Sequence, residues 1–180
     1  MSDSALAARR PFEITFSGRI LFLTDDAEQL AAQLRGEDLL EIPPLDALVD
    51  NISTDEITPG WVCFYYDETL GHYSLVGLRG ETIKPGALRA GGFDVIVSGL
   101  SKGCGSSRET APYSELWAGA KLVVARSIEK IYSQNCQNIG LLTSTDFGVL
   151  RRIRAGESIP LEEFTEGFDP ISAEIVRFGG

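Results

Sequence analysis

The sequence predicts one α/β domain, with a parallel sheet built from β-α-β units. From Phe93 onward, short apolar strands alternate with helical segments, and this alternation is typical of parallel sheets. The strands carry few polar residues, as expected where a parallel sheet is buried. No repeat, low-complexity tract or linker-like stretch divides the 180 residues, so we expect a single domain over 1–180.

The first half of the chain predicts fewer regular elements. Glu13–Leu23 is rich in Ile, Phe and Thr and predicts a strand. Asp25–Leu34 begins with a capping-type aspartate and predicts a helix, which Gly36 ends. Ile57–Ile83 is rich in aromatics and glycines, and we expect it to form β-strands and loops.

The second half of the chain predicts strands that alternate with helices, as consecutive β-α-β units require. The strands are Phe93–Ser98, Lys121–Ala125 and Gly140–Thr143, and the helices are Ser107–Ala118, Ser127–Cys136 and Asp146–Arg154.

Charge and cysteine usage exclude several classes of protein. Sixteen Lys and Arg against 26 Asp and Glu give a formal net charge of −10, which repels nucleic acid. No apolar run is long enough to span a membrane, and Met1–Arg10 lacks the apolar core of a signal peptide. Cys63, Cys104 and Cys136 are odd in number and widely spaced, which suits neither a disulfide framework nor a zinc site. We therefore expect a cytoplasmic protein that binds neither nucleic acid nor membrane.

The segment Gly99–Glu109 is the strongest candidate for chemistry. It follows a predicted strand and leads into a predicted helix, which is where ligands bind in open α/β sheets. Gly103 and Gly105 permit positive φ angles, so successive N–H groups there can form an anion-binding nest.

Two serines and an arginine follow these glycines. Ser106, Ser107 and Arg108 can surround a carboxylate with hydroxyl groups, free N–H groups and a guanidinium group. An alternative interpretation is purely structural, because Ser106 and Glu109 have the spacing of a capping box. That interpretation does not explain Arg108.

Other reaction types fit this segment poorly. It lacks the Gly-Lys-Ser/Thr of a Walker loop, the third glycine of a dinucleotide fingerprint and the G-x-S-x-G of a nucleophile elbow. His72 is the single histidine of the chain, so a nucleophilic triad at Cys104 or Ser106 is improbable.

A second polar cluster covers Asp50–Gly60. Its Asp, Asn, Ser and Thr side chains are typical of a loop that caps its own backbone, and this structural interpretation is sufficient for the cluster alone. Arg79 is, by itself, an ordinary surface cation.

Together the two clusters resemble the swivelling domain of the aconitase superfamily, most closely the separate small subunit of 3-isopropylmalate dehydratase. Four stretches carry the resemblance, in matching order and spacing: Asp50–Pro59, Gly103–Pro112, Lys121–Arg126 and Ile131–Leu142. The region that carries these signatures is about 50–147 of one swivelling domain.

The resemblance implies a β/β/α swivelling domain that closes over a large subunit, the holder of a [4Fe-4S] cluster. It implies a hydro-lyase of leucine biosynthesis, active as a heterodimer, that dehydrates and rehydrates a hydroxy di- or tricarboxylic acid. The Lewis acid for removing hydroxide would come from the partner's iron, because three scattered cysteines do not match a cluster-binding run. No metal ligand is expected on this chain.

The resemblance also implies roles for individual residues. Ser106 is similar to the serine that acts as general base, and it must then not be packed inward, out of reach of any cavity. The positions similar to substrate-binding residues are Ser107, Arg108, Asp55, Thr54, Arg79 and Gly105.

The substrate stays open at this stage. The stretch Gly60–Cys63 departs from the pattern of many isopropylmalate subunits, and Thr110 stands where a histidine is common. Isomerisation of 3-isopropylmalate to 2-isopropylmalate is the leading reaction, and 2-methylmalate, dimethylmalate and homoaconitate are alternatives. A non-enzymatic module that binds a carboxylate or phosphate is an alternative of another class. A half-site should also expose an apolar patch to its partner.

Overall fold

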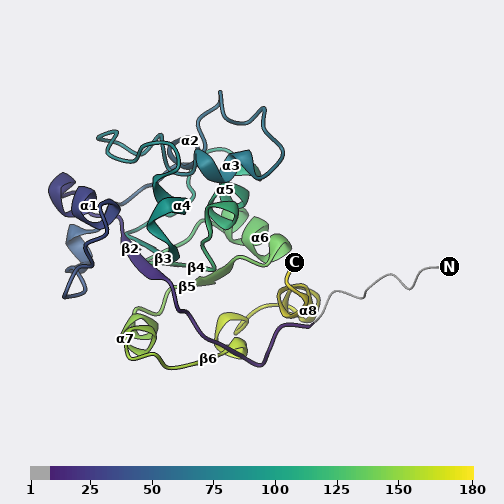
Figure 1. Ribbon diagram of the computed structural model, residues 1–180. Coiled ribbons are helices and arrows are strands. Elements are labelled where there is room, and N and C mark those ends of the chain that lie inside the picture. Colours follow the sequence, from purple (N-terminus) through teal and green to yellow (C-terminus); the bar gives the residue numbers. More distant parts are fainter. Residues whose placement is uncertain (1–8) are drawn as a thin grey trace.

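The computed structural model describes residues 9–180, which fold around a parallel sheet in the order β2-β3-β4-β5 (Figure 1). The four strands are β2 (Arg19–Phe22), β3 (Phe93–Ser98), β4 (Leu122–Ala125) and β5 (Leu142–Ser144). Neighbouring strands are also neighbours in sequence order, as expected of consecutive β-α-β units. The predicted α/β class with a parallel-sheet core is confirmed.

Helices cover both faces of this sheet. On one face lie α1 (Ala27–Leu34), α2 (Thr54–Ile57), α4 (Ala87–Gly91), α5 (Thr110–Ala118) and α6 (Lys130–Ile139). On the other face lie α7 (Gly148–Arg154), a 3-10 helix (Leu161–Phe164) and α8 (Pro170–Phe178). Figure 1 shows α4, α5 and α6 on the side of the sheet opposite α7 and α8. A short antiparallel ladder, β1 (Glu13–Ile14) with β6 (Ile159–Pro160), supplies a second β layer on the α7 side.

The strand sequences explain this double coverage. All six residues of β3 are buried, with Ile96 in the core beneath α5 and α6 and with Val95 and Val97 in the core beneath α7 and α8. Since side chains alternate between the faces of a strand, apolar residues at consecutive positions require cover on both sides. The carboxyl ends of β3 and β4 are in register, with Ser98 opposite Ala125.

The prediction of one continuous strand over Glu13–Leu23 is wrong, because the chain bends between β1 and β2. The N–H groups of Ser17 and Gly18 donate to Asp94 Oδ2 at 3.0 and 2.8 Å. A Cβ at position 18 would lie 2.5 Å from the Asp94 carboxyl carbon, so the bend accepts only glycine there. A contact with a residue 76 positions away therefore breaks the strand.

The expectation of a β-rich segment at Ile57–Ile83 is also wrong. This segment contains turns and a short helix, α3 (Thr69–His72). Gly71 packs so closely on the Trp117 backbone of α5 that a side chain would overlap it, and Leu70 is buried beside it. Gly71 therefore serves close packing of this segment against α5.

Two further observations complete the fold. A 3-10 helix covers Leu45–Ala47, in the extended link between α1 and α2. Among the helices of residues 9–180, none combines the length and the apolar character that crossing a bilayer requires.

Candidate functional site

The two polar clusters lie side by side at the carboxyl end of β3. Four backbone hydrogen bonds join them: Asn51 N–H to the Leu100 carbonyl (2.7 Å), the N–H groups of Gly103 and Cys104 to the Ile52 carbonyl (2.8 and 3.2 Å), and Thr54 N–H to the Cys104 carbonyl (2.8 Å). The carboxylate of Asp50 also accepts from the Leu100 N–H at 2.5 Å. Segments about 50 residues apart in sequence therefore form one site.

A capping box organises the first cluster. Ser53 Oγ accepts from the Glu56 N–H at 3.2 Å, and Glu56 Oε2 accepts from the Ser53 N–H at 2.8 Å. The capped-loop interpretation is thus confirmed for this cluster. Arg79 completes the arrangement by donating from Nε to Glu56 Oε1 at 2.9 Å and from Nη2 to the Asn51 carbonyl at 3.0 Å.

These contacts also lower the pKa of the Glu56 carboxyl group. Burial by itself raises the pKa of its carboxyl group, but hydrogen bonds from Arg79 and Ser53 outweigh burial, and the pKa lies below the ordinary 4.5. The same contacts raise the pKa of Arg79. Arg79 is thus committed to the base of this loop.

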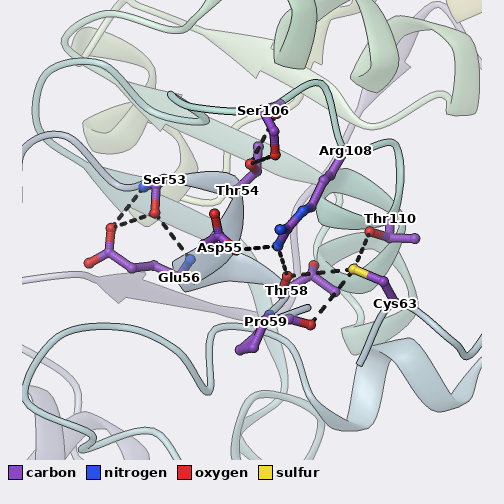
Figure 2. Close-up of polar contacts among 10 residues, drawn as sticks. All are labelled: Ser53, Thr54, Asp55, Glu56, Thr58, Pro59, Cys63, Ser106, Arg108 and Thr110. Carbon is purple, nitrogen blue, oxygen red and sulfur yellow. Dashed lines mark hydrogen bonds and ion pairs between the residues drawn. The ribbon is translucent and has the colours of Figure 1, made fainter. Parts of the chain in front are cut away.

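Ser106 is not a helix cap. The helix α5 begins at Thr110 with Glu109 as its N-cap, and no side chain caps it, so the capping-box interpretation of Ser106 and Glu109 is wrong. The side chain of Ser106 is exposed, with Oγ 3.1 Å from Thr54 Oγ1. The buried Thr54 hydroxyl also donates to the Ser106 carbonyl at 3.0 Å, which holds the loop against α2 (Figure 2).

The glycine-rich loop has the expected backbone conformation but a smaller nest. Gly103 and Gly105 have φ angles of +81° and +95°. The N–H groups of Gly103 and Cys104 both donate to the Ile52 carbonyl, at 2.8 and 3.2 Å, so they are unavailable to a ligand. Within residues 9–180, the N–H groups of Gly105, Ser106 and Ser107 have no hydrogen-bond partner. The available nest thus begins at Gly105.

Arg108 points from this loop toward the first cluster. Its guanidinium group donates to the Thr58 carbonyl at 3.0 Å and forms an ion pair with Asp55 (Figure 2). The Arg108 side chain is 28% exposed and that of Asp55 is 62% exposed, so the pair lies at the surface. Five of the predicted positions, Thr54, Asp55, Gly105, Ser106 and Arg108, therefore lie together, while Arg79 is held by Glu56 and the Asn51 carbonyl instead.

An aromatic loop borders the site. Trp61, Phe64 and Tyr66 are 57%, 85% and 82% exposed, as is expected of a docking surface rather than a core. Cys63 Sγ lies 3.5 Å from Thr110 Oγ1, at the start of α5 (Figure 2). The loop therefore adjoins the helix that follows Arg108.

The cysteines do not fit an iron-sulfur cluster. Cys63 lies beside Thr110, Cys104 lies in the glycine-rich loop, and Cys136 is buried in α6. Among residues 9–180, no group of three or more His, Cys, Asp or Glu side chains is arranged to hold a metal ion.

Sequence reasoning missed a buried charged cluster beneath the loop. Lys102 Nζ donates to Glu115 Oε1 at 2.7 Å, with both side chains 0% exposed, and the Tyr132 hydroxyl donates to the other Glu115 oxygen. No local signal predicts this cluster, because each residue alone is compatible with a solvated helix or loop position. The Ser53–Glu56 spacing, in contrast, was a readable capping-box signal.

Comparison with known proteins gives concordant results. The Aconitase C-terminal domain family matches residues 87–145. A 3-isopropylmalate dehydratase small subunit 2 of Methanopyrus kandleri is 45% identical over 52% of this chain and 54% of its own length. An isopropylmalate/citramalate isomerase small subunit of Methanocaldococcus jannaschii is 32% identical over 61% of this chain and 64% of its own length.

A further relative covers more of its own length. A 3-isopropylmalate dehydratase small subunit 1 of Methanopyrus kandleri is 38% identical over 66% of this chain and 68% of its own length. The matched part of the chain thus spans between about half and two thirds of these curated relatives. The glycine-rich loop, α5, β4 and α6 lie within the segment matched by the family. On this evidence the chain belongs to the family of 3-isopropylmalate dehydratase small subunits, and its residues 87–145 match the Aconitase C-terminal domain.

Proposed function

We propose that this chain is the small subunit of a two-component hydro-lyase that isomerises 3-isopropylmalate to 2-isopropylmalate. Our proposal assigns the [4Fe-4S] cluster to the large subunit, and it assigns proton transfer and carboxylate binding to this chain. One observation carries it: the exposed Ser106 hydroxyl lies on the same short loop as Arg108 and as three N–H groups that have no partner within residues 9–180.

Ser106 is the proposed general base, which removes the proton from the carbon next to a substrate carboxylate. A serine hydroxyl is a weak base at neutral pH, so this role requires donors that stabilise its oxyanion. The N–H groups of Gly105, Ser106 and Ser107 and the guanidinium group of Arg108 are such donors. The Thr54 hydroxyl, 3.1 Å from Ser106 Oγ, fixes the orientation of the base.

Arg108 is the proposed carboxylate-binding residue, and Asp55 holds its place until substrate arrives. Asp55 is 62% exposed, so it can move aside at little cost when a substrate carboxylate takes over the guanidinium group. The Thr58 carbonyl, 3.0 Å from Nη1, keeps Arg108 oriented during this exchange. Ser107 contributes its N–H group and its hydroxyl group to the same carboxylate.

In this proposal Arg79 acts indirectly, through the loop, and does not bind the substrate. Its two contacts hold Glu56 and the Asn51 carbonyl, and these lie at the two ends of the loop that carries Thr54 and Asp55. We therefore assign Arg79 to the shape of this loop.

The substrate side chain is the least constrained part of the proposal. The Methanocaldococcus jannaschii relative is named for both isopropylmalate and citramalate, and citramalate is 2-methylmalate. Dimethylmalate and homoaconitate need the same carboxylate contacts. Since an apolar pocket distinguishes one methylene by only about 1–3 kcal/mol, a panel of these acids identifies the preferred substrate by kcat/KM.

The large subunit is expected to cover the exposed face of the site. The aromatic loop that includes Trp61, Phe64 and Tyr66 lies beside α5, and buried aromatic residues dominate the energetics of many interfaces. Residues 9–180 present the base and the carboxylate ligands at the surface, where a second protein can close the site.

A simple anion-binding module is the alternative of another class, and the charges argue against it. Arg79 is paired with Glu56, and an anion reaches Arg108 only by displacing Asp55, so a free anion exchanges one carboxylate contact for another and should bind weakly. Calorimetry with 3-isopropylmalate distinguishes the two: the isolated chain should bind it weakly, and a Kd in the micromolar range would favour the module.

The test of the proposed base is Ser106→Ala in a complex reconstituted with the large iron-sulfur subunit. Formation of the unsaturated diacid is followed by absorbance. We expect kcat to fall by about 100-fold or more, because general-base catalysis contributes about 10²- to 10⁴-fold. The Tm should be unchanged, since Ser106 is exposed, and the large subunit should still bind, since the substitution removes a single hydroxyl group and leaves the aromatic loop intact.

Ser158→Ala is the matched control. Ser158 is also exposed, and its Oγ lies 2.8 Å from the hydroxyl of Thr15, next to β6 and on the other face of the sheet. This variant should retain wild-type kcat. If the complex with Ser106→Ala turns over as fast as the control, Ser106 is not the base.

A further inference from the structure

The buried ion pair between Lys102 and Glu115 joins the glycine-rich loop to the middle of α5, the helix that follows it. Lys102 directly precedes Gly103, and Glu115 lies on α5, the helix into which the loop leads. Lys102 Nζ donates to Glu115 Oε1 at 2.7 Å, and neither side chain is exposed. The pair therefore spans the whole segment that carries Ser106 and Arg108.

Tyr132 connects this pair to the loop backbone. Its hydroxyl group donates to the second carboxylate oxygen of Glu115, and Lys102 Nζ lies 5.8 Å from the centre of its ring. The ring also lies directly against Gly103, so closely that a Cβ atom there would overlap the Cβ and Cγ atoms of Tyr132. One side chain from α6 thus supports both the carboxylate and the start of the loop.

The residue before Lys102 shows how firmly this end is held. Ser101 has a φ angle of +53°, a conformation that L-residues other than glycine rarely adopt. Such residues persist where the surroundings over-determine the backbone. Here the Ser101 N–H donates to Ser127 Oγ at 2.8 Å, and the Lys102 N–H donates to the Ser127 carbonyl at 3.0 Å.

We propose that Lys102, Glu115 and Tyr132 are positioning residues that fix the distance between Ser106 and Arg108. The inference rests on the proposed function of these two residues. Buried ion pairs can often be replaced by apolar residues of similar volume without loss of stability, so stability alone does not explain this one. A charged pair with a third hydrogen-bonded group has a single geometry. This geometry fixes the position of Lys102 relative to α5, and thereby the course of the loop between them.

The test is the double variant Lys102→Met/Glu115→Leu, which replaces both charges by apolar side chains. We expect its Tm to stay within about 4 °C of the wild type. We expect kcat of the reconstituted complex to fall about 10- to 100-fold, since a displacement of about 1 Å in a catalytic group can cost 10²-fold. KM should change less than kcat, because Arg108 keeps its contacts with Asp55 and Thr58.

A second readout does not depend on activity. The amides of Gly103 and Cys104 are hydrogen-bonded to the Ile52 carbonyl, and their hydrogen exchange in the isolated chain reports whether the loop stays in place. We expect both amides to exchange at least about tenfold faster in the double variant. This measurement tests the positioning role even if the reconstituted wild type proves inactive, an outcome that would count against the proposed function instead.

Lys121→Met is the control for the loss of a lysine–carboxylate ion pair away from the loop. Lys121 Nζ, half exposed, binds Asp94 Oδ2 at 2.9 Å at the amino ends of β3 and β4, so kcat and loop exchange should remain at wild-type values. Tyr132→Phe keeps the ring under Gly103 and removes only the hydroxyl donor. Its kcat should fall and its loop amides should exchange faster, both by less than in the double variant. If the double variant retains wild-type kcat and wild-type exchange, the positioning role is refuted. If the double variant does not fold, the same result for Tyr132→Phe refutes it.

Discussion

Two glycines of the same loop should respond differently to alanine. Gly103 and Gly105 both have positive φ angles, +81° and +95°, so alanine at either position incurs the left-handed backbone penalty of about 1–2 kcal/mol. They differ in their surroundings. A Cβ at position 103 would overlap the buried Tyr132 ring, whereas a Cβ at position 105 would meet only Thr54 Oγ1 at 3.7 Å and Ser53 Cβ at 3.8 Å.

The overlap adds a second cost at one position only. Overpacking of a dense core costs about 1–3 kcal/mol, so Gly103→Ala should lower the free energy of unfolding by about 2–5 kcal/mol in total. Gly105→Ala should lower it by about 1–2 kcal/mol. Urea denaturation of the isolated chain measures both, and an unchanged m-value shows that the unfolded ensemble is comparable.

Gly36→Ala is the control, because it incurs the backbone penalty without overlap between the new Cβ atom and a neighbouring residue. Gly36 has a φ angle of +106°, and a Cβ there would have no heavy atom within 4 Å. We expect Gly36→Ala and Gly105→Ala to be equally destabilised. If Gly103→Ala is no more destabilised than Gly36→Ala, the close contact between the loop and Tyr132 does not exist in solution.

Two titrations provide further tests of the site. Because the pKa of Glu56 is lower in the folded chain than its ordinary 4.5, its stabilising contribution is present above that value and is lost as the pH falls through the folded pKa. The difference in free energy of unfolding between the wild type and Glu56→Gln should therefore shrink from pH 7 to pH 3 in urea titrations, and a constant difference would contradict the ion pair with Arg79. Burial first, and then the charges of Glu56 and Glu129, raise the pKa of the Cys104 thiol above 9.0, so alkylation of Cys104 by iodoacetamide, followed by peptide mass spectrometry, should be half-maximal above pH 9. Half-maximal alkylation at or below about pH 8.5 would show that this thiol is not in the environment described.

Strands whose pattern is set by local burial were predicted well. Phe93–Ser98 was predicted at its observed bounds, and Lys121–Ala125 differs from β4 by one residue. The helix predicted at Ser107–Ala118 begins only at Thr110, because Ser106 and Arg108 bind across to α2 instead of starting the helix. Element type follows from local hydrophobicity, whereas the first turn depends on partners far away in sequence.

In the segment between α2 and β3, local composition predicted the wrong type of element. Its aromatics and glycines have the composition of strands, yet Leu70 and Gly71 pack on α5 and the chain forms turns and α3. Tertiary contacts override intrinsic β-propensity in such segments. The strand predicted over Glu13–Leu23 was broken for a similar reason, by the Asp94 carboxylate.

The sequence by itself determined the α/β class, the two polar clusters and the glycine, serine and arginine residues of the proposed site, because apolar periodicity and glycine-rich turns are local properties of the chain. Only the tertiary structure decided which N–H groups stay free, that Arg108 is paired with Asp55, and that Arg79 belongs to Glu56. It also decided that Lys102 and Glu115 are buried together beneath the loop. A hydrogen bond or an ion pair forms where two groups meet in space with the right geometry, and sequence distance does not specify that geometry.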